Sequence, residues 1–294
     1  MRFALLGGDL RMAYLRQKLL SDGHAAAALA LERLLPETPP DPETVLAPAQ
    51  AVILPLPAER EGRLNAPWSS RRYALSELLP LLRTGTVVLA GMPGEALAAE
   101  CRRLGLPLAD YGAQERFLRR NAALTAEAAL PLLLEGPRAL SDSRVLVSGF
   151  GRIGKELTRR LFALGADVTV AARSESARTM AAAMGCRAVE LRDAPEPGYD
   201  AVVNTVPARL YGEAEERSFA GARLIELASP PYGFDPAGAE AAGNPVLFAP
   251  GLPGKCFPAS AAEAVRASIY ECLKEFGYHE AADRAGPDRL ILHL

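Results

Sequence analysis

"RVLVSGFGRIGKEL", residues 144–157, is the stretch of this sequence that decides the fold. A short β-branched run leads into Gly149, Gly151 and Gly154, and apolar residues then recur at helical spacing. A second strand is predicted over DVTVAAR, residues 167–173. Strand, glycine turn, helix and strand form the context in which this spacing binds a dinucleotide. The first glycine permits a tight turn, the second lets a pyrophosphate approach the backbone, and the third lets the helix pack closely.

The end of the second strand bears on the choice of cofactor. Where a fingerprint that prefers NAD has an acidic residue, this chain has Arg173, followed by Ser174 and Arg178. A guanidinium and a hydroxyl suit a 2′-phosphate, which favours NADP(H) over NAD(H). Stacking of Arg173 on the adenine is the alternative interpretation.

The carboxyl ends of the later strands are expected to border the nicotinamide, because ligands of open α/β sheets bind there. These ends are NTVPA, residues 204–208, and LASPP, residues 227–231. Asn204 is equally suited to capping a turn. The residues expected to contact the cofactor are Gly149, Phe150, Gly151, Arg152, Ile153, Gly154, Arg173, Ser174, Arg178, Asn204, Thr205, Val206 and Pro207.

Length and composition bound the remaining possibilities. A chain of 294 residues is long enough for two domains, and a net charge of −2 gives no electrostatic reason to bind nucleic acid or an anionic membrane. No apolar window is long enough for a membrane span or a signal peptide, so a cytoplasmic protein is expected. Four scattered cysteines indicate neither disulfides nor a metal site, and three histidines outside any motif disfavour histidine catalysis.

The first half is predicted to form a second parallel α/β domain, flavodoxin-like in outline. Leu10, Tyr14 and Leu19 are spaced for the buried face of a helix, and residues 36–43 form a Pro-rich loop. The expected strands are RFALLGG (2–8), HAAAALAL (24–31), AVILPLP (51–57), TVVLAGMP (86–93) and LPLADY (106–111).

Two long helical patterns organise the chain. One covers residues 114–136 and is interrupted by Pro131; the other covers 258–279, with Ala264, Ile269 and Leu273 on a buried stripe. The fold is predicted to be two Rossmann-like doubly wound parallel-sheet domains with a cleft between them, linked by two crossing helices. The expected parts are a substrate domain at 1–120 with helix 258–280 packed on it, a nucleotide-binding domain at 121–257, and a tail at 281–294.

Several segments taken together resemble the dehydrogenase-type A subunit of dipicolinate synthase, in order, from about residue 3 to about residue 276. They are GGDLR (7–11), PLP (55–57), QERFLRRNAALTAEAAL (114–130), SGFGRIGKEL (148–157), NTVPA (204–208), LASPPYGFD (227–235) and APGLPGK (249–255). The resemblance implies a dehydrogenase that makes pyridine-2,6-dicarboxylate from 4-hydroxy-tetrahydrodipicolinate during spore formation, with the flavoprotein-like B subunit of dipicolinate synthase as partner. The chain departs from the family at Pro231-Tyr232, where a second glycine is usual, which leaves substrate-side details open.

The implied substrate has two carboxylates and a ring hydroxyl, so it calls for cationic groups. Arg11, close to Asp9, is a candidate carboxylate clamp, and Lys255 is the catalytic candidate, since it could donate a proton to the leaving hydroxyl or bind a carboxylate. A merely solvated role is the alternative for both. The other candidate substrate contacts are Asp9, Tyr111, Glu115, Asn121 and Thr125.

Two other functions stay open. One is a D-2-hydroxyacid or alanine dehydrogenase, which is weakened by the lack of a well-placed histidine. The other is a nucleotide-binding regulatory protein without activity of its own, because fold does not determine function. A homo-oligomer is compatible with either.

Overall fold

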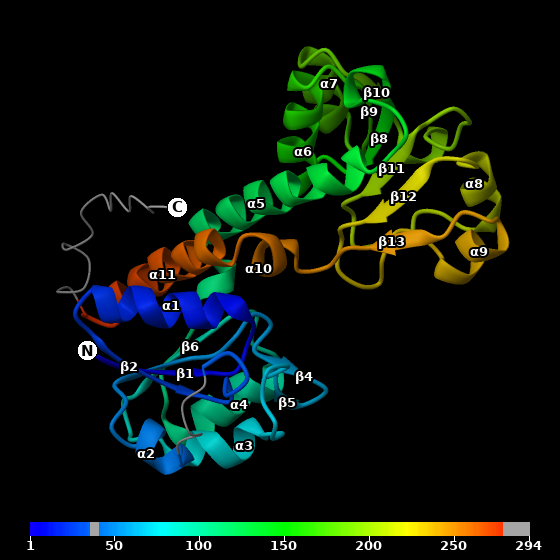
Figure 1. Ribbon diagram of the computed structural model, residues 1–294. Helices are drawn as coiled ribbons and strands as arrows, with labels where there is room; N and C mark the ends of the chain where they lie inside the picture. The colour runs from blue at the N-terminus through cyan, green and yellow to red at the C-terminus, as the bar shows by residue number, and fades with distance from the viewer. Residues whose placement is uncertain (36–40, 279–294) are drawn as a thin grey trace. The chain divides into compact units, whose positions relative to one another are not determined.

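The chain forms two α/β units in the computed structural model, which describes residues 1–35 and 41–278 (Figure 1). The first unit consists of Met1–Arg120 and the segment from Pro258 onward, and the second consists of Asn121–Phe257. The chain enters the second unit within helix α5 (Glu115–Leu134) and leaves it just before helix α11 (Pro258–Glu275). The second unit is therefore an insertion between two segments of the first. The tail expected at 281–294 and residues 36–40 of the Pro-rich loop lie outside the described residues.

The first unit contains a five-stranded parallel sheet with the strand order β2-β1-β3-β6-β7. This is the flavodoxin order, so the prediction of a second doubly wound domain is confirmed. The strands are β1 (Arg2–Leu6), β2 (Ala25–Leu29), β3 (Ala51–Ile53), β6 (Val87–Ala90) and β7 (Leu108–Asp110). A short antiparallel hairpin, β4 (Glu59–Arg60) with β5 (Arg63–Leu64), was not expected, because two-residue strands leave no alternating pattern.

Both faces of this sheet are covered. Phe3 and Leu5 of β1 face α1 (Leu10–Ser21) and α11, which lie side by side in Figure 1, whereas Ala4 and Leu6 face the opposite layer. That layer contains α2 (Pro42–Leu46), α3 (Leu75–Leu78) and α4 (Glu95–Leu104). Ala264, Ile269 and Leu273 of α11 are buried, as predicted.

The predicted buried face of α1 is wrong for Tyr14, which is 39% exposed. The residues of α1 that reach the core are Met12, Leu15 and Leu19. They follow the i, i+3, i+7 spacing of one helix face, to which Tyr14 does not belong.

The second unit contains a six-stranded parallel sheet with the order β10-β9-β8-β11-β12-β13, which is the Rossmann order. The strands are β8 (Arg144–Ser148), β9 (Asp167–Ala171), β10 (Arg187–Val189), β11 (Ala201–Asn204), β12 (Arg223–Glu226) and β13 (Val246–Phe248). One face packs against α5, α6 (Arg152–Ala163) and α7 (Glu175–Ala183), and the other against α8 (Glu213–Ser218) and α9 (Pro236–Ala241). The predicted fold class is confirmed for both units.

Two local expectations need correction. Helix α5 is continuous through Pro131, which has no N–H to donate to Glu127 and yet does not end the helix. The predicted APGLPGK loop contains a short helix, α10 (Leu252–Cys256), which begins after Gly251 in the left-handed region at φ +69°.

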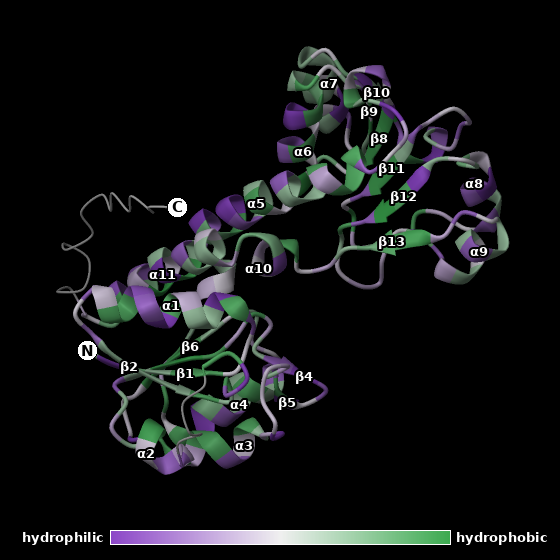
Figure 2. Ribbon diagram, in the orientation of Figure 1, coloured by the Kyte–Doolittle hydropathy of each residue, from purple (hydrophilic) through white to green (hydrophobic). Residues whose placement is uncertain are grey.

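The strands are strongly apolar, as their green colour in Figure 2 shows, because both sheets are covered on two faces. Among the buried polar residues that break this rule, two lie at neighbouring strand ends. Asn204 ends β11 and Glu226 ends β12; they are paired in register and are 0% and 1% exposed. No helix in the described part of the chain is both long and apolar enough to span a membrane.

Candidate functional site

The glycine turn after β8 has the geometry that its spacing predicts. Gly149 has φ +96°, and a Cβ there would come within 2.6 Å of both Thr205 Oγ1 and Val206 Cγ2. A Cβ on Gly154 would collide with the carbonyl oxygen of Gly149. Both positions are therefore restricted to glycine, one by conformation and packing and the other by packing alone.

Gly151 has a different role. It is the N-cap of α6, it provides no side-chain cap, and a Cβ there would meet no atom within 4 Å. The N–H groups of the first turn of a helix have no partner inside the helix, and together they attract an anion. The N-terminus of α6 is thus open to the pyrophosphate of a dinucleotide.

The side chains of the turn divide into two kinds. Phe150 is 7% exposed and belongs to the core beside α5 and α6, so its side chain serves packing. Lys155 Nζ lies 5.7 Å from the centre of the Phe150 ring. Arg152 is exposed and Ile153 is half-buried at the start of α6.

The three polar residues expected at the 2′-position of the ribose have separate surroundings. Arg173 is exposed, and Ser174 caps α7 by accepting from Ala177 N at 3.3 Å. Arg178 Nη1 donates to the carbonyls of Ala172 and Arg173 at 3.0 and 2.8 Å, while its Nη2 pairs with Glu190. Arg178 therefore braces the backbone in this structure and leaves Arg173 as the exposed cation.

The turn after β11 is built around Asn204. Its Nδ2 donates to the Val206 carbonyl at 2.9 Å and to Glu226 Oε1 at 2.7 Å, and its Oδ1 accepts from Val206 N at 3.0 Å. Thr205 Oγ1 donates to the Ser148 carbonyl at 2.9 Å. Asn204 is a predicted cofactor contact, and in this structure its amide is buried and hydrogen-bonded within the turn. Pro207 is exposed and Val206 is half-buried beside Gly149.

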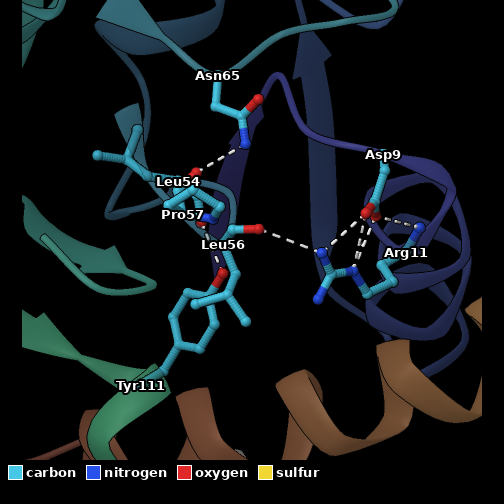
Figure 3. Close-up of polar contacts among 7 residues, drawn as sticks. All are labelled: Asp9, Arg11, Leu54, Leu56, Pro57, Asn65 and Tyr111. Carbon is cyan, nitrogen blue, oxygen red and sulfur yellow. Dashed lines mark hydrogen bonds and ion pairs between the residues drawn. The ribbon is translucent and has the colours of Figure 1, made fainter. Parts of the chain in front are cut away.

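A second polar cluster lies at the carboxyl end of β1 in the first unit (Figure 3). Asp9 is the N-cap of α1 and accepts from Arg11 N at 3.1 Å. Arg11 Nε and Nη2 donate to the two oxygens of Asp9, each at 2.8 Å, and Nη2 also donates to the Leu56 carbonyl at 3.2 Å. Strands β2 and β3 flank β1, so this is the switch point at which flavodoxin-like sheets bind ligands.

Asp9 keeps the buried Arg11 charged. Burial by itself lowers the pKa of the Arg11 guanidinium, but the hydrogen bonds and charge of Asp9 outweigh burial and raise that pKa above its usual value. Arg11 Nη1 makes no hydrogen bond among the described residues, which leaves two N–H donors for a ligand.

The Leu54–Pro57 segment after β3 is fixed by groups that are distant in sequence. Tyr111 donates its hydroxyl to the Leu54 carbonyl at 2.9 Å, and Asn65 Nδ2 donates to the Pro57 carbonyl at 2.9 Å. Tyr111 is 1% exposed, and burial raises the pKa of its hydroxyl above the usual range. Tyr111 is a candidate substrate contact from the sequence; in this structure its hydroxyl bonds the Leu54 carbonyl and positions the backbone beside Arg11.

Both halves of the chain match known family models. Residues 2–112 match the N-terminal domain of the dipicolinate synthase A subunit, and residues 114–224 match the NAD-binding domain of D-isomer specific 2-hydroxyacid dehydrogenases. The A subunit of dipicolinate synthase from Bacillus subtilis is 26% identical over 300 residues, covering 95% of this chain and 98% of that protein. Along almost its whole length the chain is similar to the A subunit of dipicolinate synthase. Its second unit is an NAD-binding domain of the dehydrogenase type.

Solved structures agree with this family. The crystal structure of the dipicolinate synthase A subunit from Bacillus halodurans has a TM-score of 0.80 and 25% identity, covering 92% of this chain and 97% of that one. The apo-structure of D-lactate dehydrogenase from Escherichia coli has a TM-score of 0.62 at 14% identity and covers 94% and 97% of the two chains. The likeness to D-lactate dehydrogenase shows a shared fold.

The remaining candidate residues lie on α5 and α10. Glu115 is exposed and pairs with Arg119 at 2.7 Å, and Thr125 Oγ1 donates to the Asn121 carbonyl at 2.8 Å, one turn back on α5. Lys255 is exposed on α10 and forms no ion pair within the described residues. Lys255 and Asn121 belong to the second unit, whereas Arg11 and Glu115 belong to the first.

Sequence reasoning missed Glu226. Its carboxylate accepts four hydrogen bonds at the ends of two strands. Burial raises the pKa of Glu226, although the N–H donors around it act in the opposite direction. The available signal was a charged residue inside the apolar run LIEL, residues 224–227. Within the described part of the chain, His, Cys, Asp and Glu side chains form no group that could hold a metal ion.

Proposed function

We propose that this chain is the NAD(P)-dependent oxidoreductase component that forms dipicolinate from 4-hydroxy-tetrahydrodipicolinate by dehydration and hydride transfer. The observation that carries the proposal is the open N-terminus of α6, where the N-cap Gly151 has no side chain and lies beside Gly149 and Gly154. That turn suits a pyrophosphate, and the similarity to dipicolinate synthase A subunits suggests the substrate. We further propose the flavoprotein-like B subunit of dipicolinate synthase as partner, a cytoplasmic location and a role in spore formation.

The reaction balances as two losses from the ring. The C–O bond of the ring hydroxyl breaks, and that hydroxyl takes up a proton and leaves as water. A C–H proton on the adjacent ring carbon passes to a base, and the electron pair of that C–H bond forms the new C=C bond. The resulting dihydropyridine loses a hydride and a proton and becomes aromatic, which provides the driving force. A nicotinamide held at this turn would supply the hydride acceptor, so the protein has to orient the ring carbon and assist the proton transfers.

Arg11 and Lys255 supply the charges this chemistry needs. The buried guanidinium of Arg11 is oriented by Asp9 and the Leu56 carbonyl, and its Nη1 remains available for one substrate carboxylate. Lys255, exposed and outside any ion pair of the described residues, donates the proton to the leaving hydroxyl or binds the second carboxylate. Asn121, Thr125 and Glu115 are secondary substrate candidates.

A test of Lys255 uses reduction of the nicotinamide cofactor with freshly generated hydroxy-tetrahydrodipicolinate. Lys255→Ala lowers turnover by about 100-fold with cofactor affinity unchanged, because the proton donor is lost. Lys274→Ala, which removes a lysine paired with Glu271 on α11, is the matched control and keeps wild-type turnover. Unchanged turnover in Lys255→Ala rejects Lys255 as the catalytic group.

The same assay separates the competing functions. Product formed without any partner protein rejects a purely regulatory role, and turnover of a 2-hydroxy acid in its place supports a hydroxyacid dehydrogenase. One observation argues against the latter. His24, the histidine among the described residues, precedes β2 at the amino end of the first sheet, opposite the edge where ligands bind.

NADP is the preferred cofactor in this proposal because Arg173 is an exposed cation at the end of the second strand of the Rossmann sheet. Arg173→Ala weakens NADPH binding about tenfold and leaves NADH binding unchanged, since only the 2′-phosphate contact is removed. Arg192→Ala, an exposed arginine of the same unit, is the control. Tighter binding of NADH than of NADPH to the wild type refutes the preference.

A further inference from the structure

The carboxylate of Glu226 joins two segments of the chain at the carboxyl edge of the second sheet. Oε1 accepts from Asn204 Nδ2 at 2.7 Å and from Ala228 N at 2.9 Å. Oε2 accepts from Gly233 N at 2.7 Å and from Phe234 N at 3.4 Å. A carboxylate that is 1% exposed is costly to bury unless it is fully hydrogen-bonded, and its four donors come from the end of β11 and from the loop after β12.

One arm of this arrangement reaches the glycine turn. Asn204, held by Glu226, binds both the N–H and the carbonyl of Val206. Val206 and Thr205 in turn press against Gly149, where a Cβ would come within 2.6 Å of each of their side chains. Through these contacts the Glu226 carboxylate helps to position the turn against which Gly149 packs.

The other arm fixes the loop Ala228–Phe234. Three N–H groups of this loop point at the carboxylate, and a Cβ on Gly233 would run into the Asn204 amide. The loop and the end of β11 therefore pack closely against each other at Gly233, and both are hydrogen-bonded to the same carboxylate.

The sheet order assigns these loops to one half of the cofactor. Strand β9, with Arg173 at its end, lies on one side of β8, and β11 and β12 lie on the other. The ribose next to the adenine binds at the end of the second strand of a Rossmann sheet, and the pyrophosphate binds at the first helix. The nicotinamide half then faces the ends of β11 and β12.

We infer that Glu226 is a positioning residue for the nicotinamide half of the dinucleotide, acting through Asn204 and the Ala228–Phe234 loop. The inference rests on the proposed function in that it requires a bound nicotinamide cofactor. Glu226 itself is enclosed by protein donors and touches neither substrate nor cofactor.

The test compares two ligands that differ by the nicotinamide ring, NADH and ADP-ribose, in binding titrations of the full chain. Glu226→Gln replaces one acceptor oxygen by an NH2 group, which then faces N–H donors of one of the two loops. NADH binding weakens about tenfold, since hydrogen bonds to a charged group are lost, and ADP-ribose binding changes by less than about twofold. Glu216→Gln is the control, because Glu216 is another buried carboxylate of this unit and accepts from Asp235 N.

A second variant keeps the test decisive if Glu226→Gln folds poorly. In the exchange N204D/E226Q, the new amide at 226 donates to the new carboxylate at 204 while its oxygen accepts from Gly233 N. The exchange does not restore the contacts to the Val206 carbonyl and to Ala228 N. We expect this double variant to recover part of the NADH affinity relative to Glu226→Gln. Recovery is not expected if Glu226 serves stability alone.

Three outcomes overturn the inference. Equal losses of NADH and ADP-ribose in Glu226→Gln, or a lowered melting temperature with both affinities intact, show that Glu226 only supports the fold. The same NADH-selective loss in Glu216→Gln shows that any buried carboxylate of the unit has this effect. A wild type that binds neither ligand refutes the proposed function and this inference together, whereas the other outcomes leave the proposed function standing.

Discussion

The two units place a helix N-terminus at the same point, directly after the first strand of a parallel sheet, and they treat it in opposite ways. In the first unit the N-cap is Asp9, with φ −105° and ψ −167°, and its carboxylate accepts from Arg11 N. In the second unit the N-cap is Gly151, with φ −79° and ψ −158°, and no side chain covers the helix end. The backbone is extended at both positions, so the difference lies in the side chain.

This difference teaches how one arrangement of strand and helix can accept two kinds of anion. The dipole of α1 is already satisfied by the Asp9 carboxylate, which repels a phosphate. The first unit instead offers the remaining N–H groups of Arg11 Nη1, a donor pair suited to a carboxylate. The open end of α6 suits a pyrophosphate. Each prediction below alters one side of this contrast.

The largest effect is expected when the cap of the first unit is moved to the second. Gly151→Asp fits, because no atom lies within 4 Å of a Cβ at this position. We expect dinucleotide affinity to fall by about 100-fold or more, since a carboxylate now occupies the anion site, while the melting temperature stays equal or rises.

Gly151→Asn is the matched control for this change, because it caps the helix without adding a charge. It should weaken binding less than Gly151→Asp in the same titration. Equal losses would show that the side chain acts by blocking space, and unchanged binding in Gly151→Asp would refute the placement of the pyrophosphate at α6.

A smaller effect is expected when the pair in the first unit is broken. Asp9→Asn preserves the helix cap but leaves the buried Arg11 guanidinium without its counter-charge. The free energy of unfolding of the first unit should fall by about 2 kcal/mol in chemical denaturation. Asp41→Asn is the control, because Asp41 is an exposed N-cap of α2 that makes no side-chain cap. If both variants lose the same free energy of unfolding, the pairing of Asp9 with Arg11 contributes no more stability than an exposed acidic residue does.

The smallest effect concerns the amino edge of the second sheet, where Glu196 joins Arg187 of β10 to Arg144 of β8. The hydrogen bond from Arg187, helped by Tyr199 and Arg144, lowers the pKa of Glu196 to about 2. A carboxyl whose folded-state pKa is depressed adds stability above its unfolded pKa and loses it as the pH falls toward its folded pKa. Glu196→Gln should therefore cost about 1 kcal/mol at pH 7, after allowance for solvent screening.

The pH dependence is the decisive part of that measurement. The stability difference between wild type and Glu196→Gln should shrink steadily between about pH 5 and pH 2. Glu95→Gln, which removes an exposed partner of Arg102, should show almost no difference at any pH. A difference that stays constant with pH would contradict the role assigned to the Glu196 charge.

Sequence predicted the parts of the site that depend on local spacing. Gly149, Gly151 and Gly154 are close in the chain, and their roles follow from backbone conformation and from the helix that starts among them. The alanine-rich strand β2 was also predicted, because its position after a turn outweighed its helical composition. These inferences needed no knowledge of distant partners.

Sequence could not predict which polar side chains are already engaged in hydrogen bonds within the protein. Tyr111 finds the Leu54 carbonyl, 57 residues away, and Asn204 finds Glu226, 22 residues away. Each is a plausible ligand contact by residue type, and each is buried against a partner that only the folded sheet brings near. The same reason hid Glu226, whose four donors converge from two segments of the chain.

The order of the two units along the chain has a consequence for synthesis. Helix α11 supplies Val265, Ile269 and Leu273 to the same core as Phe3 and Leu5 of β1. During translation the first unit therefore cannot complete its core until the whole of Asn121–Phe257 and then α11 have been synthesised. The second unit can fold during translation, and a message truncated before codon 258 yields a complete nucleotide-binding unit attached to an unfinished partner.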